Sequence, residues 1–318
     1  MKTATLTKLL LAISAVDTAC GVSFYVSLSG NDGGSGTRDQ PFKTLGQAQR
    51  AVRKQLESSL LEDISVHVTP GVHSLSAPLV LTASDSGKNG FRVNWIGDNT
   101  VLSGGLKVTG WAQGPNGVYS AAVPAGTASR NLYVNGVAAN YARRKINRKD
   151  FSYVGTGMTW TNAANDWLQT AEGLAGAEVR FISSFTDRYA QIKSVSNRQL
   201  VMVQTAWQDQ LRGYDTISKP NAEFGVWVQN APSLFSDGGQ FYLDSKAGKV
   251  YYKPLAGENM GTAETYLGVL EAIVVVGGTY DNPAHDITFQ GLSFVSRLAS
   301  SRPSSASSNV ANTGVTPY

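Results

Sequence analysis

Hydrophobic positions recur at helical spacing in one early stretch of this chain. Leu45, Ala48, Val52 and Leu56 lie three or four residues apart, so they share one face of a helix. Thr44 stands directly before them and is a suitable N-cap. The pattern therefore predicts an amphipathic helix with one apolar stripe to bury. The basic side chains of this stretch fall on or near its wet side: Arg50, Arg53 and Lys54.

The segment ahead of this helix predicts a short strand followed by an irregular loop. Residues 24–26 combine aromatic and β-branched side chains, which suit a pleated surface. Residues 29–40 are rich in glycine and include Asn31 and Asp32, a composition that favours turns. Oxygen ligands from Asn31 and Asp32 would suit calcium, but turn chemistry alone explains both residues. The three histidines lack the spacing of a zinc site, so no metal site and no cofactor are predicted.

Beyond residue 60 the chain alternates hydrophobic and polar residues in short runs. Ile64, Val66 and Val68 show this period of two, and Gly, Asn or Asp bounds each run. Short successive strands of this kind suit the coils of a solenoid, although periodicity alone leaves a β-sandwich equally open. The runs occupy residues 64–68, 79–81, 91–96 and 101–102, and again 273–276 and 287–294.

Residues 130–260 carry a different pattern, that of consecutive antiparallel strands. Asn135 and Gly136 form the pair that a tight primed turn favours. A run at 241–243 is expected to pair with 250–252. Consecutive antiparallel strands indicate an inserted β-sandwich-like module. A meander with a turn at 196–198 is predicted from the runs 179–185, 188–195 and 199–204.

Composition supports a turn-dense β protein rather than a helical bundle. The 318 residues are 42% hydrophobic and 16% charged, and they include 33 glycines. The net charge of +4 is slight, and no ribonucleoprotein signature or long basic helix accompanies it. We therefore expect no nucleic-acid or membrane partner, and a monomer.

Neither end of the chain is predicted to belong to a folded domain. Lys2 and Lys8 precede an apolar run at 9–16 and then small residues, which together predict a secretory signal at 1–21 and a secreted protein. The apolar run is shorter than the about 20 residues that span a bilayer. Cys20, the only cysteine, lies in the cleavage zone. At the other end, residues 296–308 carry seven serines, and no ordered structure is expected there.

Several motifs together resemble a known family. Tyr25 to Asp32 reads Tyr-Val-Ser-Leu-Ser-Gly-Asn-Asp, and Gly-Thr, Pro-Phe-Lys-Thr-Leu and a short helix follow. This order resembles the amino-terminal cap of secreted right-handed parallel β-helix proteins of the pectin-lyase-like superfamily. Later stretches resemble the amino-terminal half of glycoside hydrolase family 141-like proteins, in order over residues 24–295: 101–111, 132–143, 241–254 and 285–294.

The resemblance implies an all-β fold, a right-handed parallel β-helix with a capping strand and helix and an inserted antiparallel module. It also implies a carbohydrate-active enzyme, a glycoside hydrolase whose partner is a polysaccharide or glycan. In that family the catalytic acids sit on later coils, beyond Tyr318, so the chain is expected to be a fragment and its catalytic pair is unknown. The expected domains are the signal at 1–21, the cap and first coils at 22–129, the module at 130–260, the resumed β-helix at 261–295 and the tail at 296–318.

Other classes of function stay open. A non-catalytic carbohydrate-binding or degenerate β-helix protein is the main alternative, followed by a polysaccharide lyase, which needs a base beside a cation, and by a structural surface protein. Hydrolysis requires two carboxylates across the scissile bond. Several are available, although each also suits a turn or a strand end: Asp187, Asp209, Asp237, Asp244 and Asp286.

Two kinds of side chain are candidates for substrate binding. Arg143 and Arg144 open a basic run that could meet an acidic glycan, or could simply be a solvated loop. Trp160 and Trp207 are candidates for stacking on sugar rings, although tryptophan more often belongs to a core. Trp167 and Trp227 carry the same two alternatives.

Overall fold

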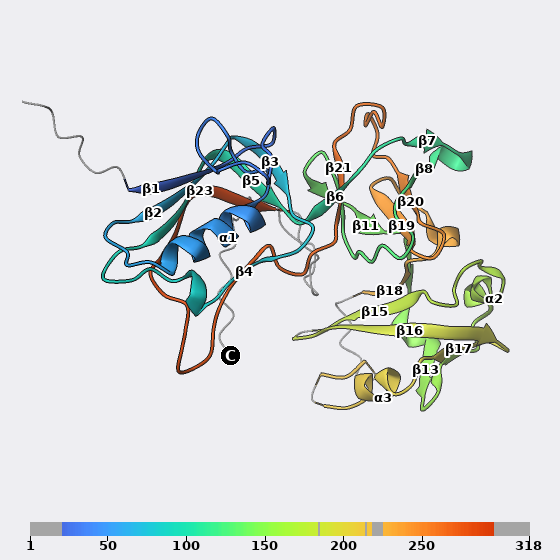
Figure 1. Cartoon of the computed structure of the whole chain (residues 1–318). Coiled ribbons are helices and arrows are strands. Elements are labelled where there is room, and N and C mark those ends of the chain that lie inside the picture. The colour runs from blue at the N-terminus through green and yellow to red at the C-terminus, as the bar shows by residue number, and fades with distance from the viewer. Residues whose placement is uncertain (1–20, 184, 214, 218–224, 296–318) are drawn as a thin grey trace, which may run out of the picture. The chain divides into compact units, whose positions relative to one another are not determined.

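Strands make up a larger share of the described chain than helices do (Figure 1). The computed structural model describes residues 21–183, 185–213, 215–217 and 225–295. All but one residue of the expected signal at 1–21, and the whole Ser-rich tail, lie outside the described residues. Two compact units divide the rest. Unit 1 comprises 21–73, 79–101 and 274–293, and unit 2 comprises 74–78, 102–273 and 294–295.

Unit 1 is built on a parallel sheet. Its first three neighbouring strands lie side by side in the order in which they occur along the chain, and the fourth comes from the far end of the described chain. Val66 lies beside Phe24 on one neighbouring strand and beside Trp95 on the other. Val66 and Trp95 are 0% and 1% exposed, so like residues stack between adjacent strands. A second, two-stranded parallel pair completes the unit. The sheet contains β1 (Val22–Val26), β2 (Ile64–Val68), β3 (Gly71–Ser74), β5 (Val93–Ser103) and β23 (Ile287–Val295), and the pair contains β4 (Leu79–Leu81) and β22 (Val274–Val276).

The predicted cap helix is present as α1 (Leu45–Leu56), and its apolar stripe is buried. The Thr44 side chain accepts a hydrogen bond from the Gln47 amide, as an N-cap does. Asp32 is part of the same cap, because its carboxylate accepts from the amides of Lys43 and Thr44 and from the Thr44 hydroxyl at 2.8–2.9 Å. Because these three donors bind the Asp32 carboxylate, helix capping rather than calcium binding explains the position of Asp32 in this loop.

One basic residue of α1, Arg53, lies near the wet side as predicted, with its side chain 42% exposed, but it also reaches a buried carboxylate. Arg53 binds Asp85 through two contacts of 2.8 Å, and Asp85 is 1% exposed. Gln49 and the Thr82 amide donate to the same carboxylate at 3.0 and 2.7 Å. The sequence gives no sign of this link, because the two partners stand 32 residues apart. The ion pair fixes α1 to the short 3-10 turn η1 (Ala83–Asp85).

Unit 2 contains a seven-stranded sheet with its own apolar core. The predicted meander is confirmed, although its first strand ends at Ile182, and Phe185 is 81% exposed. The turn at Asn197 and Arg198 takes positive φ values of 51° and 56°. In sheet order the strands are β12 (Arg143–Ile146), β18 (Val226–Gln229), β15 (Glu178–Ile182), β16 (Asp187–Ser196), β17 (Gln199–Met202), β14 (Gly157–Trp160) and β13 (Phe151–Val154).

Two smaller sheets of unit 2 share a second core. The predicted hairpin at Asn135 and Gly136 is confirmed, with positive φ at both residues. The pairing of 241–243 with 250–252 is confirmed as well. Five strands form one sheet: β11 (Asn140–Tyr141), β19 (Gln240–Asp244), β20 (Lys249–Lys253), β8 (Tyr119–Ala122) and β7 (Ala112–Gln113). Four form the other: β10 (Val137–Ala138), β9 (Leu132–Val134), β21 (Thr265–Gly268) and β6 (Gly105–Val108).

The all-β prediction is therefore confirmed in its general form: strands dominate, and one curled parallel sheet stands beside several antiparallel ones. One prediction in detail was wrong. The runs at 91–96 and 101–102 form the single strand β5 rather than two strands. The finer prediction, a right-handed parallel β-helix, stays a prediction, as do the sequence-based domain boundaries.

Candidate functional site

The seven-stranded sheet has one apolar face and one polar face. Along β15, Val179 and Phe181 enter the apolar core, while Glu178 and Arg180 point to the opposite side. Cross-strand pairing extends this second side across four strands in two rows. The first row is Arg143, Gln229, Glu178 and Gln191, and the second is Lys145, Trp227, Arg180 and Tyr189. With Asp187 and Arg130, which bind to them, these residues are called the polar face.

Arg180 and Asp187 form the best enclosed ion pair of the polar face. The guanidinium Nε and a terminal nitrogen donate to the two carboxylate oxygens at 2.9 and 2.8 Å. The side chains are 9% and 11% exposed, so the pair is largely shielded from water. Tyr189 donates its hydroxyl to the same carboxylate at 2.9 Å. Burial, together with this bond to Asp187, raises the pKa of Tyr189 to about 12, although the Arg180 charge acts in the opposite sense.

Glu178 is held in a similar way by Arg130. A terminal nitrogen of Arg130 lies 2.7 Å from Oε1, and Gln229 donates to that oxygen at 2.8 Å. The guanidinium also lies over the rings of Tyr141 and Tyr189, at 5.5 and 4.7 Å from their centroids. Burial raises the pKa of Tyr141 well above its ordinary value. Both carboxylates of the polar face are thus bound to arginine.

At the β12 edge of the polar face two cations share one indole ring. Arg143 lies 5.3 Å and Lys145 5.9 Å from the Trp227 centroid. No carboxylate of the described residues lies within ion-pair distance of either one. Burial and the nearby Arg180 charge lower the pKa of Arg143, although Asp237 acts in the opposite sense. The edge therefore carries excess positive charge beside an aromatic ring, which Asp237 offsets only in part.

The structure separates the binding residues that were predicted from the sequence. Arg144 lies between Arg143 and Lys145 on the strand but pairs with Val228, on the opposite face, where it sits 4.2 Å from the Trp167 centroid. Trp160 and Trp207 are 3% and 0% exposed and belong to the apolar core. Neither indole offers a ring face to a sugar. Of the four predicted residues, only Arg143 lies on the polar face.

Strand alternation is the signal that would have distinguished Trp227 from the other tryptophan candidates and added Lys145 to the polar face. Trp227 stands between Val226 and Val228, which are both buried, so a period of two places its ring on the other side. The same rule separates Lys145 from Ile146. What the sequence lacks is the pairing partner of each strand, because β12 and β18 lie far apart in the chain.

Three of the other carboxylates considered for catalysis, those of Asp237, Asp244 and Asp286, have local structural partners. Asp244 accepts from the Ala247 amide at 2.8 Å, which caps a turn. Asp286 faces the neighbouring His285 at 2.9 Å, and Asp237 accepts from Ser236 at 2.9 Å. Asp209 contributes its backbone carbonyl to Arg188 at 3.4 Å. None of these contacts joins two carboxylates.

The resolved pKa shifts of carboxylates in the described ranges are all downward. For Asp32 and Asp85 burial acts upward but hydrogen bonds outweigh it, and for Asp166 and Asp215 hydrogen bonds from Arg198 and Ser183 are the main cause. A general acid of a glycosidase needs a raised pKa. The four carboxylates with a resolved shift therefore act as anchors of the fold. The described residues do not place three or more His, Cys, Asp or Glu side chains together as metal ligands.

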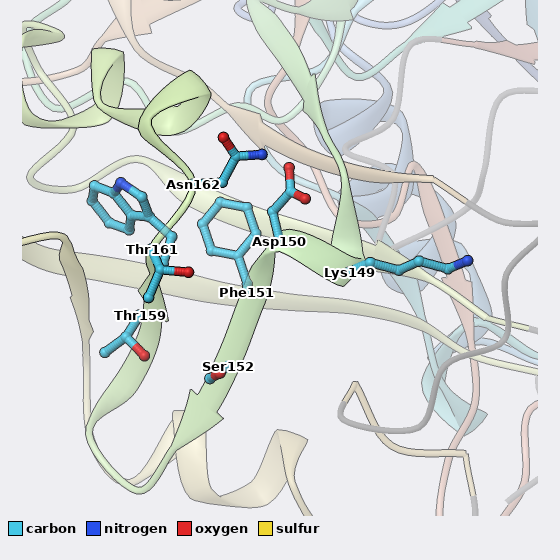
Figure 2. A pocket seen from close by; sticks show the side chains of 8 residues that line it. Lys149, Asp150, Phe151, Ser152, Thr159, Thr161 and Asn162 are labelled. Atoms are coloured by element: carbon cyan, nitrogen blue, oxygen red, sulfur yellow. The ribbon is translucent and has the colours of Figure 1, made fainter.

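A small pocket lies at the base of the β13–β14 hairpin (Figure 2). Its volume of about 220 Å³ is below the range usual for ligand sites. Figure 2 shows Asp150 and Asn162 on the same side of the hairpin, with Lys149 directed away from them. The aromatic rings of this hairpin are buried, so the pocket offers no ring for stacking. It is lined by Lys149, Asp150, Phe151, Ser152, Thr159, Trp160, Thr161 and Asn162.

The fold is similar to that of a solved protein described as "Glycoside hydrolase". The TM-score is 0.74 at 23% identity, and the alignment covers 87% of this chain and 51% of that one. A second structure, "The complex structure of XylC with xylose", gives a TM-score of 0.36 at 14% identity over 87% and 36% of the chains, too low to indicate a shared fold. No protein-family model and no curated protein matches.

The likeness to the first of these structures shows that this chain has a glycoside hydrolase-like fold. The chain spans about half the length of that protein. In the described part of the chain, no helix has the length and apolar character needed to cross a membrane.

Proposed function

We propose that this chain is the N-terminal portion of a secreted glycoside hydrolase that acts on polysaccharide, with unit 1 beginning a right-handed parallel β-helix. One observation carries the proposal: the fold likeness to a glycoside hydrolase over 87% of this chain. The parallel pairing of β1, β2 and β5 in chain order agrees with a coiled solenoid. The secretory signal predicted at 1–21 would support an extracellular location.

The exposure of strand β22, which pairs with β4, supports further coils that would cover it. Leu81 of β4 is 0% exposed, whereas its register partner Val276 on β22 is 51% exposed. In a solenoid each coil covers the one before it, so β22 resembles a coil that lacks its cover. We place the catalytic acids on such later coils, as the resemblance to the family implies.

A non-catalytic carbohydrate-binding protein is the second candidate. It is favoured by the contacts of Glu178 and Asp187, because both carboxylates of the polar face are already bound to arginine side chains of the same face. The polar face with Trp227 would then bind glycan without cleaving it. A polysaccharide lyase is a third reading, one that acts on uronates.

The test begins with the intact mass of the native secreted protein, detected with an antibody raised to residues 24–295. A species much heavier than 33.8 kDa supports the longer hydrolase. That native species is then incubated with neutral and acidic polysaccharides. New reducing ends without an unsaturated product support hydrolysis, and an ultraviolet-absorbing unsaturated product indicates a lyase. Binding without either product supports the second candidate, and neither binding nor cleavage contradicts a carbohydrate function.

A further inference from the structure

The polar face carries more positive than negative charge, and the excess is at one place. Four cations and two carboxylates lie on it. Arg130 and Arg180 are each bound to a carboxylate, which leaves Arg143 and Lys145 without one among the described residues. Both unpaired cations belong to β12, the first strand in the order of the sheet, and both contact Trp227.

The positive charge around Trp227 is only partly offset, because Asp237 acts on Arg143 without forming an ion pair with it and Arg180 alone is bound to a carboxylate. Arg143 is half-buried, and Lys145 and Arg180 both pair with or contact Trp227, so like charges surround one indole. Like charges close to one another repel, although water screens the exposed Lys145 more than the half-buried Arg143. An anion bound between Arg143 and Lys145 would remove that repulsion.

The chemistry of the three side chains defines the anion. A guanidinium binds a carboxylate through two parallel hydrogen bonds, and an ammonium adds a point charge. An indole packs against the apolar face of a sugar ring while leaving its hydroxyls in water. A carboxylate attached to a pyranose ring uses all three groups, whereas a free inorganic anion leaves the ring of Trp227 unused.

We propose that Arg143, Lys145 and Trp227 form a subsite for a uronic-acid residue of an acidic polysaccharide. The inference rests on the proposed carbohydrate function and names the sugar chemistry that the polar face selects. Arg143 binds the carboxylate, Lys145 adds electrostatic attraction, and Trp227 supports the ring. Arg180 stays bound to Asp187 and keeps the floor of the subsite rigid.

The experiment measures binding of the full chain to oligogalacturonate by calorimetry, with the fully methyl-esterified oligosaccharide as the matched neutral probe. We expect the acid form to bind at least tenfold more tightly and its affinity to fall as salt is added. Arg143→Gln should lower the affinity roughly tenfold or more, as loss of a charged hydrogen bond does. Lys145→Gln should lower it roughly threefold, since an exposed cation contributes less.

The chain offers a matched control in Arg144→Gln, which removes the same charge from the same strand but on the opposite face. It should change the affinity less than twofold. Arg143→Lys keeps the charge without the fork and should fall between wild type and Arg143→Gln. Trp227→Leu should weaken binding of the oligosaccharide but leave binding of polyglutamate unchanged. Circular dichroism confirms that each variant is folded.

Four outcomes would overturn the inference. Equal affinity for the acid and the methyl ester shows that the carboxylate is not recognised. Equal loss in Arg144→Gln and Arg143→Gln shows non-specific attraction, as does wild-type binding of polyglutamate as tight as that of oligogalacturonate. Binding of neutral polysaccharide alone overturns the uronate subsite but leaves the proposed carbohydrate function standing. That function fails only if the native protein neither binds nor cleaves any polysaccharide tested.

Discussion

Charged side chains serve different purposes in the two units. In unit 1, Arg53 of α1 forms an ion pair with Asp85. The Asp32 carboxylate accepts hydrogen bonds from the donors at the start of the same helix. In unit 2, charges spread across four strands of the polar face, and Arg143 and Lys145 keep no carboxylate partner among the described residues. A charge that is satisfied internally stabilises a fold. A surplus charge beside an aromatic ring is available to a ligand.

The comparison predicts that core and polar substitutions separate stability from binding. Changes inside either core or at a closed ion pair should lower the free energy of unfolding. Changes at the β12 edge should lower affinity and leave stability nearly unchanged, because neither Arg143 nor Lys145 has an ion-pair partner among the described residues.

Trp207→Ala should cause the largest loss of stability. The indole is 0% exposed, and its Nε1 donates to the Val154 carbonyl at 2.8 Å. Truncation leaves a large cavity, so we expect the free energy of unfolding to fall by about 3–5 kcal/mol in urea titrations. A loss below about 1 kcal/mol would show that Trp207 is not a core residue and would restore it as a sugar-stacking candidate.

Trp95 gives the matched position in unit 1. It is 1% exposed, but its Nε1 has no hydrogen-bond partner in the part of the chain that the structure describes. Trp207→Phe leaves the Val154 carbonyl without its donor, whereas Trp95→Phe removes an unsatisfied donor. The loss at Trp207 should therefore exceed that at Trp95 by about 1–2 kcal/mol. A larger loss at Trp95 contradicts the hydrogen-bond argument.

The closed ion pair of the polar face should be nearly as sensitive. Asp187→Asn and Arg180→Gln each leave a largely buried charge without its partner, which costs about 3 kcal/mol in such pairs. In a double-mutant cycle the combined loss should fall short of the sum by about 1–3 kcal/mol. Lys107→Gln, an exposed change elsewhere in unit 2, is the control and should stay within about 0.5 kcal/mol. Additive losses would show that the two side chains do not interact.

Much of the local structure could be predicted from the sequence, because its signals lie within a few residues. Thr44 and the stripe of α1, the turn at Asn135 and Gly136, and the alternation of β2 are examples. The candidate site could not be predicted from the sequence, because it depends on the pairing register between strands that lie far apart in the chain. Arg143 meets Gln229 only through the pairing of β12 with β18, and no local pattern specifies that partner.

Burial of tryptophan was similarly ambiguous. The sequence leaves the same two alternatives, core or sugar stacking, for Trp160, Trp207 and Trp227. In the structure the first two are buried, and of the three only Trp227 contacts the cations of β12. Alternation along β18 distinguishes Trp227, whereas Trp207 lies on the short helix α3 (Ala206–Gln210), where no such rule applies. The difference is set by packing, which the amino-acid type does not determine.

The ion pair beneath α1 should make unit 1 sensitive to acid. Burial alone would raise the pKa of Asp85, but hydrogen bonds from Arg53, Thr82 and Gln49 outweigh it and lower the pKa. The stabilisation is therefore present above the ordinary aspartate pKa of about 3.9 and is lost as pH falls through the lower folded value. Asp85→Asn should cost about 2 kcal/mol at pH 7.

The same variant should also flatten the acid limb of the stability profile, measured by urea unfolding between pH 6 and pH 2, a range chosen to bracket the about 3.9 reference value. Asp39→Asn, on an exposed loop position, is the matched control and should retain the wild-type slope. Equal slopes in Asp85→Asn and wild type would mean that other carboxylates account for the acid response.

Tyr189→Phe should have the smallest effect and extends the comparison to alkaline pH. The hydroxyl donates to Asp187, which keeps its bonds to Arg180, so we expect a loss of about 1 kcal/mol at pH 7. The folded pKa of about 12 is above the ordinary value of 10.0, so this contribution is present below pH 10.0 and is lost as pH rises through about 12. The absorbance of phenolate, compared between wild type and Tyr189→Phe, should reveal one tyrosine that ionises near pH 12. A difference that titrates near pH 10 instead would place Tyr189 in water and open the polar face at the position where the structure closes it.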